Sequence, residues 1–259
     1  MKYLIAIDSD GTLRHSDGTI SDRTKKVIQK LITLGNIVVI CTARPRYHTL
    51  SISKKVGINN YLISSNGTEV YDKLENKNIF TSYLSKNICK KIYSDIVKLG
   101  IRGIFVTDNT EYATQFTRNN NQILLDDTNK SDLLEKNIKQ IMIIGSEKDK
   151  INEYKKYAVE KYNQNIIDSF DEGKSEISFS IISNHASKGI ALKKLAKYLN
   201  IPLDKTIAIG NDKNDISMFE TSGLSVAVAN AADDVKKKAN LITSSNDEDG
   251  LADFLEKLY

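Results

Sequence analysis

The sequence predicts an α/β fold in which a doubly wound, Rossmann-like parallel sheet carries an inserted α+β domain. Residues 3–7 and 37–41 are short apolar runs of strand length, which is typical of parallel strands buried on both faces. A segment with apolar residues at helical spacing separates them, so they form a βαβ unit whose crossover should be right-handed. Between residues 82 and 182 this rhythm changes to that of an α+β insert with an antiparallel sheet.

The N-terminal segment supplies the first strands and helices of the core. Ser21 is the expected N-cap of a helix that ends near residue 34, before Gly35. The strand over residues 37–41 is followed by Pro45, which suits the first turn of a helix over residues 45–56. A third strand over residues 61–64 turns at Asn66-Gly67 into a returning strand over residues 68–71.

The insert and the C-terminal segment complete the predicted order. In the insert we expect helices near residues 86–99 and 149–162, with strands over 102–106, 141–144, 166–168 and 176–182. After it, Ser187 caps a helix, and strands over 206–209, 224–228 and 241–242 alternate with helices. We therefore assign residues 1–81 and 183–259 to the core and residues 82–182 to the insert. Within the insert, residues 118–120 are expected to form a solvated loop.

Composition limits the class of protein. Of the 259 residues, 40% are hydrophobic and 27% charged, which is ordinary for a globular protein. The net charge of +4 comes without a basic cluster interleaved with aromatic residues, so we expect no nucleic-acid partner. We see neither a signal peptide nor an apolar run of about eighteen residues, so we expect no membrane partner and a cytoplasmic location. Free thiols at Cys41 and Cys89 suit that compartment.

Two carboxylates stand where the first strand should end. Asp8 and Asp10 directly follow residues 3–7, and Gly11 lets the backbone turn sharply there. Acids in a loop are common turn residues, so the pair alone carries little weight. However, ligands of open α/β sheets bind beyond the carboxyl ends of the strands. Carboxylates this close also repel each other and must share a proton or a cation.

A second acidic cluster, GNDKND over residues 210–215, follows the strand over residues 206–209. Helix capping would account for one of its acids. The density of side-chain oxygens suits a hard cation such as Mg²⁺. This cluster is therefore a candidate metal site.

Three further residues occupy strand ends or helix starts. Lys188 begins a helix at its positive end, where an anionic partner would stabilise the lysine; taken alone, an exposed lysine at a helix end is the ordinary explanation. Thr42 ends the second strand, and Arg44 follows it; each could contact an anion, although strand termination and solvent exposure are the ordinary explanations. Together, two acids, a metal cluster, a hydroxyl and a lysine describe phosphoryl transfer, which needs positioning and charge neutralisation. A carboxylate can then act as the nucleophile.

These residues resemble the four motifs of the haloacid dehalogenase-like (HAD) phosphatase superfamily: residues 8–13 (DSDGTL), Thr42, Lys188 and residues 210–215. Residues 64–67 (SSNG), residues 187–189 (SKG) and the position of the insert resemble the Cof-type branch, which has a class IIB cap. The resemblance implies a HAD fold whose cap closes over the active site and selects the substrate.

The resemblance also implies roles for the motif residues. Asp8 would be the nucleophile and a Mg²⁺ ligand, and Asp10 the general acid/base, whose backbone carbonyl binds the metal. Lys188 would hold phosphoryl oxygens and steady Asp8. The implied catalytic residues are Asp8, Asp10 and Lys188; the substrate-binding residues Ser9, Thr42, Ala43, Arg44, Lys188 and Asn214; and the metal ligands Asp8, Asp10, Asn211 and Asp215.

Two positions depart from the family pattern. Asn211 stands where the family usually has aspartate, so the site loses one negative charge; either Asn211 or Asp212 would then serve as the ligand. Asp215 would support the metal shell or Lys188. Ala43 stands where glycine is common, which is a milder change.

The leading hypothesis is a Mg²⁺-dependent phosphatase of small phosphorylated metabolites, with sugar phosphates expected, acting through an aspartyl-phosphate. One alternative is a phosphomutase or phosphotransferase of the same fold. Another is a catalytically weak phosphate-ligand binding protein, which only Asn211 favours. We expect a monomer or a weak homodimer.

Overall fold

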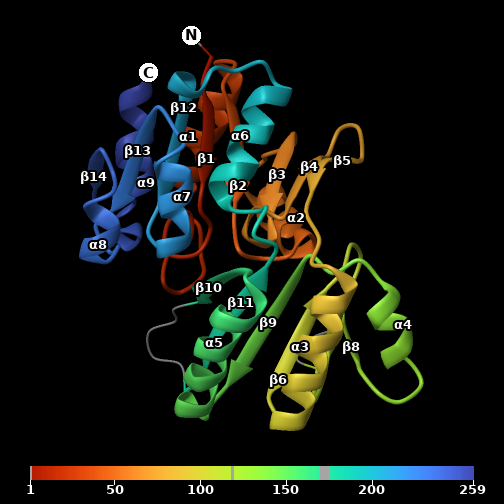
Figure 1. Ribbon diagram of the computed structural model, residues 1–259. Helices are drawn as coiled ribbons and strands as arrows, with labels where there is room; N and C mark the ends of the chain where they lie inside the picture. The colour runs from red at the N-terminus through yellow and green to blue at the C-terminus, as the bar shows by residue number, and fades with distance from the viewer. Residues whose placement is uncertain (1, 118–119, 170–174) are drawn as a thin grey trace. The chain divides into compact units, whose positions relative to one another are not determined.

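The computed structural model describes residues 2–117, 120–169 and 175–259 and divides the chain into two compact units (Figure 1). Unit 1 comprises Met1–Thr81 and Ser187–Tyr259, and unit 2 comprises Ser82–Ala186. The sequence predicts that the insert ends at residue 182, four residues before the end of unit 2. Asn165 Nδ2 of unit 2 donates to the carbonyl of Ala186 at 2.8 Å, which ties these last residues to the same unit. Arg118 and Asn119, from the polar loop of the insert, lie outside the described residues.

Unit 1 is built on an eight-stranded sheet in the order β14-β13-β12-β1-β2-β3-β4-β5. The six strands from β14 to β3 run parallel, whereas β4 pairs antiparallel with both β3 and β5. The bounds are β1 Leu4–Ile7, β2 Ile37–Cys41, β3 Tyr61–Ser64, β4 Glu69–Asp72, β5 Lys77–Thr81, β12 Thr206–Gly210, β13 Leu224–Val228 and β14 Leu241–Thr243. We did not predict β5, whose exposed Lys77 and Asn78 give no apolar signal.

Helices cover both faces of this sheet, as a doubly wound fold requires (Figure 1). Successive residues of β1 point to opposite faces. Ile5 belongs to the core that includes α1 and α2, whereas Leu4 belongs to the core that includes α6 and α7. Burying an apolar side chain of this size completely stabilises the folded state by roughly 1.5–3 kcal/mol. The helices are α1 Asp22–Thr33, α2 Arg46–Lys55, α6 Lys188–Tyr198, α7 Ile216–Phe219, α8 Asp233–Lys236 and α9 Gly250–Leu255.

The centre of the sheet positions the motif residues. Strand β1 lies between β12 and β2, so the loops after these three parallel strands leave the same edge of the sheet. The backbone N–H of Asp8 donates to the carbonyl of Ile209 at 2.9 Å, which ties the first loop to the end of β12. The predicted α/β fold class is confirmed, and the motifs fall at this carboxyl edge.

Unit 2 is an α+β unit with a six-stranded sheet in the order β10-β11-β9-β6-β7-β8. Its core includes Ile92 of α3, Tyr154 of α5 and Ile141 of β9. The pairing is antiparallel except between β7 and β8, and the sequence pattern predicts neither of these two strands. The bounds are α3 Lys86–Leu99, β6 Arg102–Val106, β7 Glu111–Ala113, β8 Gln122–Leu124, α4 Lys130–Glu135, β9 Gln140–Gly145, α5 Lys148–Tyr162, β10 Asn165–Ser169 and β11 Ile177–Ile182.

Both cysteines are free and buried, Cys41 in β2 and Cys89 in α3. Within the described ranges, no helix combines the length and the apolar character needed to cross a bilayer.

Candidate active site

A buried lysine between two carboxylates forms the centre of the candidate site in unit 1. Lys188 Nζ donates to Asp8 Oδ1 at 2.6 Å and to Asp215 Oδ1 at 2.5 Å. All three residues are buried. Asp8 follows β1, Lys188 opens α6 after its N-cap Ser187, and Asp215 follows β12, so three distant parts of the chain meet here.

The charges of this cluster do not balance. One ammonium faces two carboxylates, and burial makes an uncompensated charge costly. Burial raises the pKa of Asp8, with a smaller contribution from the charge of Asp215, while Lys188 opposes the rise. Burial alone would lower the pKa of Lys188, but the charges of Asp215 and Asp8 outweigh it and raise the pKa. A further positive charge next to Asp8 would therefore favour its ionised, nucleophilic form.

The side chain of Asn211 meets the loop after β1. Its terminal amide lies 3.3 Å from Asp8 Oδ2, 2.9 Å from the carbonyl oxygen of Asp10 and 2.8 Å from Thr12 Oγ1. An amide nitrogen at this position faces three acceptor oxygens and can donate its two hydrogens among them, whereas an amide oxygen would accept only from the Thr12 hydroxyl. A Cβ on Gly11 would lie 2.6 Å from the other terminal atom of this amide, and φ of Gly11 is +77°, so glycine is required here.

This group of atoms fits a small divalent cation. Carboxylate, backbone carbonyl and amide oxygens are the hard ligands that Mg²⁺ prefers, completed by water. Asp8 Oδ2 and the Asp10 carbonyl supply two of them, and the unbalanced charge at Asp8 favours a cation there. The Asn211 amide, whose nitrogen faces these oxygens here, would have to turn over to present its oxygen to the cation. The described part of the chain contains no cluster of three or more His, Cys, Asp and Glu side chains placed to hold a metal. A cation here would thus depend on a backbone carbonyl and an amide.

Asp215 and Asp212 organise the loop after β12. Asp215 Oδ2 accepts the backbone N–H groups of Asn211 at 2.9 Å and Asp212 at 3.0 Å. The Asp212 side chain turns back to accept the backbone N–H of Lys213 at 2.7 Å, in a capping box. Of the two ligand candidates in this loop, the structure therefore brings Asn211, and not Asp212, to Asp8. Asp215 contacts Lys188 through its other oxygen.

The side chain of Asp10 is held by two arginines. Arg44 binds it in a bidentate manner, with Nε–Oδ2 and Nη2–Oδ1 distances of 2.6 and 2.9 Å, and Arg14 Nη1 lies 2.6 Å from Oδ1. Partial burial alone would raise the pKa of Asp10, but the hydrogen bonds and charges of Arg44 and Arg14 outweigh it and lower the pKa. In this arrangement Asp10 is a carboxylate that can accept a proton.

The other expected substrate-binding residues lie around this centre. Thr42 is buried at the end of β2, and its hydroxyl accepts the backbone N–H of Arg44 at 3.2 Å. Ala43, between them, is half-buried. Ser9 is buried, and its hydroxyl has no hydrogen-bond partner among the described residues. Asn214 Nδ2 donates to Asn66 Oδ1 at 2.9 Å. The structure shows no side-chain hydrogen bond from any of these four to the Asp8 carboxylate within the described ranges, so their roles stay predictions.

Sequence reasoning missed two residues of the site. Thr12 contacts the Asn211 side chain, and Arg14 pairs with Asp10. Thr12 belongs to the DSDGTL motif, where its hydroxyl was a usable signal. Arg14 follows Asp10 by four residues, but the loop conformation that brings their charges together is not visible in the sequence.

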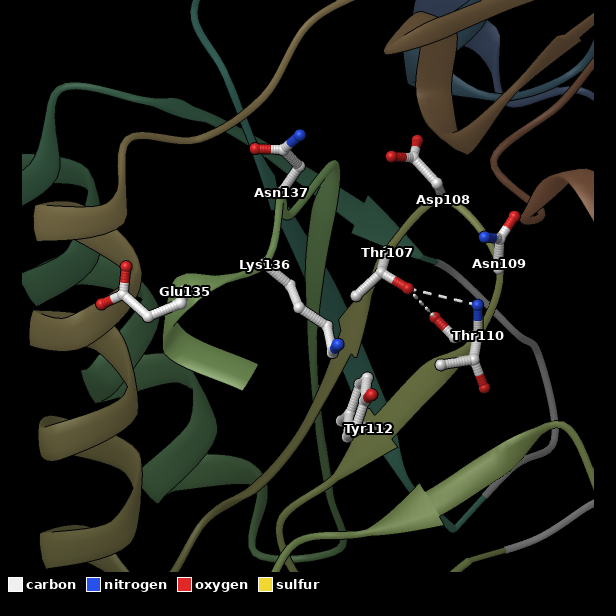
Figure 2. A pocket seen from close by; sticks show the side chains of 8 residues that line it. All are labelled: Thr107, Asp108, Asn109, Thr110, Tyr112, Glu135, Lys136 and Asn137. Atoms are coloured by element: carbon white, nitrogen blue, oxygen red, sulfur yellow. Dashed lines mark hydrogen bonds between the residues drawn. The ribbon is translucent and has the colours of Figure 1, made fainter. Parts of the chain in front are cut away.

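A separate hollow lies within unit 2, with a cavity volume of about 290 Å³ (Figure 2). Thr107 Oγ1 donates to the carbonyl of Thr110 at 2.8 Å at its rim. The Glu135 carboxylate is paired with Lys86 and Lys90 of α3. The lining residues are Thr107, Asp108, Asn109, Thr110, Tyr112, Glu135, Lys136 and Asn137.

Known proteins resemble the chain over nearly its whole length. The family model of the haloacid dehalogenase-like hydrolases matches residues 5–255. The chain is 30% identical to phosphatase YwpJ of Bacillus subtilis, covering 98% of this chain and 99% of the relative. It is 27% identical to 5-amino-6-(5-phospho-D-ribitylamino)uracil phosphatase YitU of the same organism, covering 99% and 97%.

Solved structures of haloacid dehalogenase-like proteins also resemble this chain over nearly its whole length. A haloacid dehalogenase-like hydrolase from B. subtilis superposes with a TM-score of 0.87 at 27% identity, covering 99% of this chain and 100% of the other. The HAD subclass IIB sugar phosphatase BT4131 superposes with a TM-score of 0.84 at 20% identity, covering 99% and 98%, which shows a shared fold.

The chain belongs to the haloacid dehalogenase-like hydrolase family. The resemblance inferred from the motifs and the expected enzyme class, a HAD-type phosphatase, are thereby confirmed.

Proposed function

We propose that the protein hydrolyses phosphate monoesters of small polyhydroxylated metabolites, with sugar phosphates as the expected class, through a phosphoryl-Asp8 intermediate. The observation that carries this proposal is the buried Asp8 carboxylate, which is held by Lys188 and adjoins the oxygens grouped around Asn211. Asp8 has the position of a nucleophile, and Lys188 can neutralise charge on a transferring phosphoryl group.

In the first step, an Asp8 oxygen attacks the phosphorus, and the bond from phosphorus to the alcohol oxygen breaks. Lys188 keeps the Asp8 carboxylate in place through its Nζ contact and is itself fixed by Asp215. The leaving alkoxide takes a proton from the Asp10 carboxyl group. In the second step, Asp10 removes a proton from water, which attacks the phosphorus and restores Asp8.

Bound Mg²⁺ would be held by Asp8, the Asp10 carbonyl and Asn211, and it would neutralise charge on the phosphate oxygens. The Asp10 carboxylate is suited to the second step as it stands, because Arg44 and Arg14 keep its pKa low. To donate in the first step it must bind a proton, which weakens its pairing with the arginines. The two arginines therefore keep Asp10 in the ionised form that the second step requires.

The substrate class rests on two similar proteins. YitU is named for a substrate with a phosphorylated ribityl chain, and BT4131 is described as a sugar phosphatase. Both descriptions place the phosphate ester on a polyhydroxylated carbon chain. We extend this class to the present chain and assign selection of the substrate to unit 2, acting as a cap. We further propose that it is a cytoplasmic monomer or weak homodimer, without nucleic-acid or membrane partners. The buried free thiols fit that compartment.

The direct assay measures release of inorganic phosphate from a panel of sugar and polyol phosphates. We expect Mg²⁺-dependent release that stops when EDTA is added and returns with excess Mg²⁺. The same reactions, run with a second unphosphorylated sugar, distinguish the alternatives. Transfer of phosphate to that sugar without release would indicate a phosphotransferase. Binding of phosphate esters without either reaction would indicate the weak binding protein.

Replacing Asn211 with aspartate should strengthen binding of Mg²⁺. The change adds one negative charge beside Asp8 Oδ2, so we expect the Mg²⁺ concentration for half-maximal activity to fall about tenfold, equivalent to about 1.4 kcal/mol. Titration of activity with Mg²⁺ measures this. Asp212→Asn is the matched control and should leave the midpoint unchanged, because Asp212 caps the following turn. A shift in Asp212→Asn, with none in Asn211→Asp, would make Asp212 the ligand.

A further inference from the structure

The turn after β3 has a backbone conformation that ordinary residues seldom adopt. Ser65, Asn66 and Gly67 have φ values of 50°, 57° and 83° in succession, and all three residues are buried. Two consecutive non-glycine residues in the left-handed region are unfavourable and persist only where surrounding contacts fix them. Such strain is concentrated at functional sites, so the contacts of this turn need an explanation.

This turn contacts two other segments of the active site through its backbone. The N–H of Asn66 donates to the carbonyl of Thr42 at 3.0 Å, which fixes the turn to the end of β2. A Cβ added to Gly67 would lie 2.2 Å from the carbonyl oxygen of Ser187, so the turn also packs closely against the start of α6. That start carries Lys188.

The side chain of Asn66 reaches a third segment. Its Oδ1 accepts a hydrogen bond from Asn214 Nδ2 at 2.9 Å. Asn66 is therefore linked directly to the segments that carry Thr42 and Asn214, and the next residue, Gly67, packs against the segment that carries Lys188.

The side-chain amides of Asn66 and Asn214 are incompletely hydrogen-bonded. Among the residues that the structure describes, the buried atoms Asn66 Nδ2 and Asn214 Oδ1 have no partner. If both amides are turned over, their mutual hydrogen bond is kept, and the unpaired NH₂ group moves from Asn66 to Asn214. Either orientation leaves a buried donor without an acceptor, which is costly unless a ligand supplies one. An anionic oxygen is the acceptor that the proposed chemistry provides.

We infer that Asn66 is a positioning residue for phosphate binding, which holds the Asn214 amide toward the phosphoryl oxygens and fixes the Thr42 loop beside them. This inference rests on the proposed phosphatase function and adds a residue to it. Asn66 acts through its neighbours, so its loss should weaken binding of inorganic phosphate and of substrate together.

The test replaces Asn66 with glycine, which adopts the same backbone conformation without strain and removes the side chain with its amide. We expect the KM for a sugar phosphate, and the inhibition constant of inorganic phosphate, to rise about tenfold or more. Asn214→Ala should have a similar effect, and the double variant should lose little more, because the two amides act as a pair. The matched control is Asn76→Gly, since Asn76 has φ 49° in the exposed turn between β4 and β5. It should keep wild-type constants.

Unchanged constants in Asn66→Gly, or fully additive losses in the double variant, would overturn the inference. If Asn66→Gly melts well below the Asn76→Gly control, Asn66→Asp replaces it, because aspartate keeps the acceptor for Asn214 and substitutes an anionic oxygen for the donor. That variant should also bind inorganic phosphate at least tenfold more weakly, and wild-type binding would again overturn the inference. A wild-type protein that releases no phosphate would reject the proposed function instead. Calorimetry with inorganic phosphate, comparing wild type and Asn66→Gly, would still test the residue.

Discussion

Replacing Asp8 with asparagine is expected to abolish phosphate release, lowering kcat by at least about 10⁴-fold, because an amide cannot form the phosphoryl intermediate. Asparagine has nearly the shape of aspartate, so Lys188 should keep its contact with Asp215. Release of inorganic phosphate under saturating substrate measures the effect.

The same substitution should stabilise the metal-free protein. Burial raises the pKa of Asp8 from 3.8 to about 8, so ionising this carboxyl costs folding stability, and the cost grows as the pH rises through that window. Asparagine carries no charge at any pH in the window. We therefore expect the Tm of Asp8→Asn in EDTA to exceed that of wild type by a few degrees at pH 8, and the difference to shrink toward pH 4.

The control for both effects is Asp17→Asn, which changes an exposed carboxylate in the following loop. It should keep wild-type activity and should not reproduce the rise in Tm. If Asp8→Asn hydrolyses substrate as fast as wild type, Asp8 is not the nucleophile. If the Asp8→Asn protein is less stable than wild type in EDTA at pH 8, the ionised Asp8 carboxylate is not an uncompensated charge in the metal-free protein.

Replacing Lys188 with methionine should damage both activity and stability. The Asp215 carboxylate would then be buried without its ammonium partner, and Asp8 would lose the contact that favours its ionised form. Breaking such a buried pair costs about 3–5 kcal/mol. For a chain of this size that corresponds to a fall in Tm of roughly 10 °C. Thermal unfolding in EDTA at about pH 7 measures the loss of stability, and phosphate release should become undetectable in the same variant.

Two companion variants isolate the role of the charge at Lys188. Lys193→Met changes an exposed lysine of the same helix and should behave as wild type. Adding Asp215→Asn to Lys188→Met removes the buried carboxylate that has lost its ammonium partner. Part of the lost stability should therefore return, while activity stays absent. A Lys188→Met protein with wild-type Tm and activity would contradict the central ion pair.

Local patterns predicted the elements that place the site. The apolar run before Asp8 could only be a short buried strand, and the polar residues directly after it marked the strand end. Lys188 was recognisable because a cation at a helix start needs an anionic partner, and the structure supplies two. These signals lie in neighbouring residues of the sequence, so they can be recognised without knowledge of the tertiary structure.

Other features depend on contacts that no local pattern encodes. Asn211 and Asp212 are adjacent and equally polar, and only the capping conformation of Asp212 decides which of them faces Asp8. The pairing of Arg14 with Asp10 depends on the shape of a loop. Strand β5 is held at the sheet edge by its backbone pairing with β4, although its sequence lacks an apolar face.

The most direct test of the account is chemical trapping of the phosphoryl group on Asp8. The Mg²⁺-loaded wild-type enzyme is quenched during turnover of a sugar phosphate and reduced with borohydride, which converts an aspartyl-phosphate into homoserine. Peptide mass spectrometry then locates the modified residue. The account predicts homoserine at position 8, dependent on substrate and absent from Asp8→Asn. Modification at another residue, or full turnover with position 8 unmodified at every quench time, would contradict it.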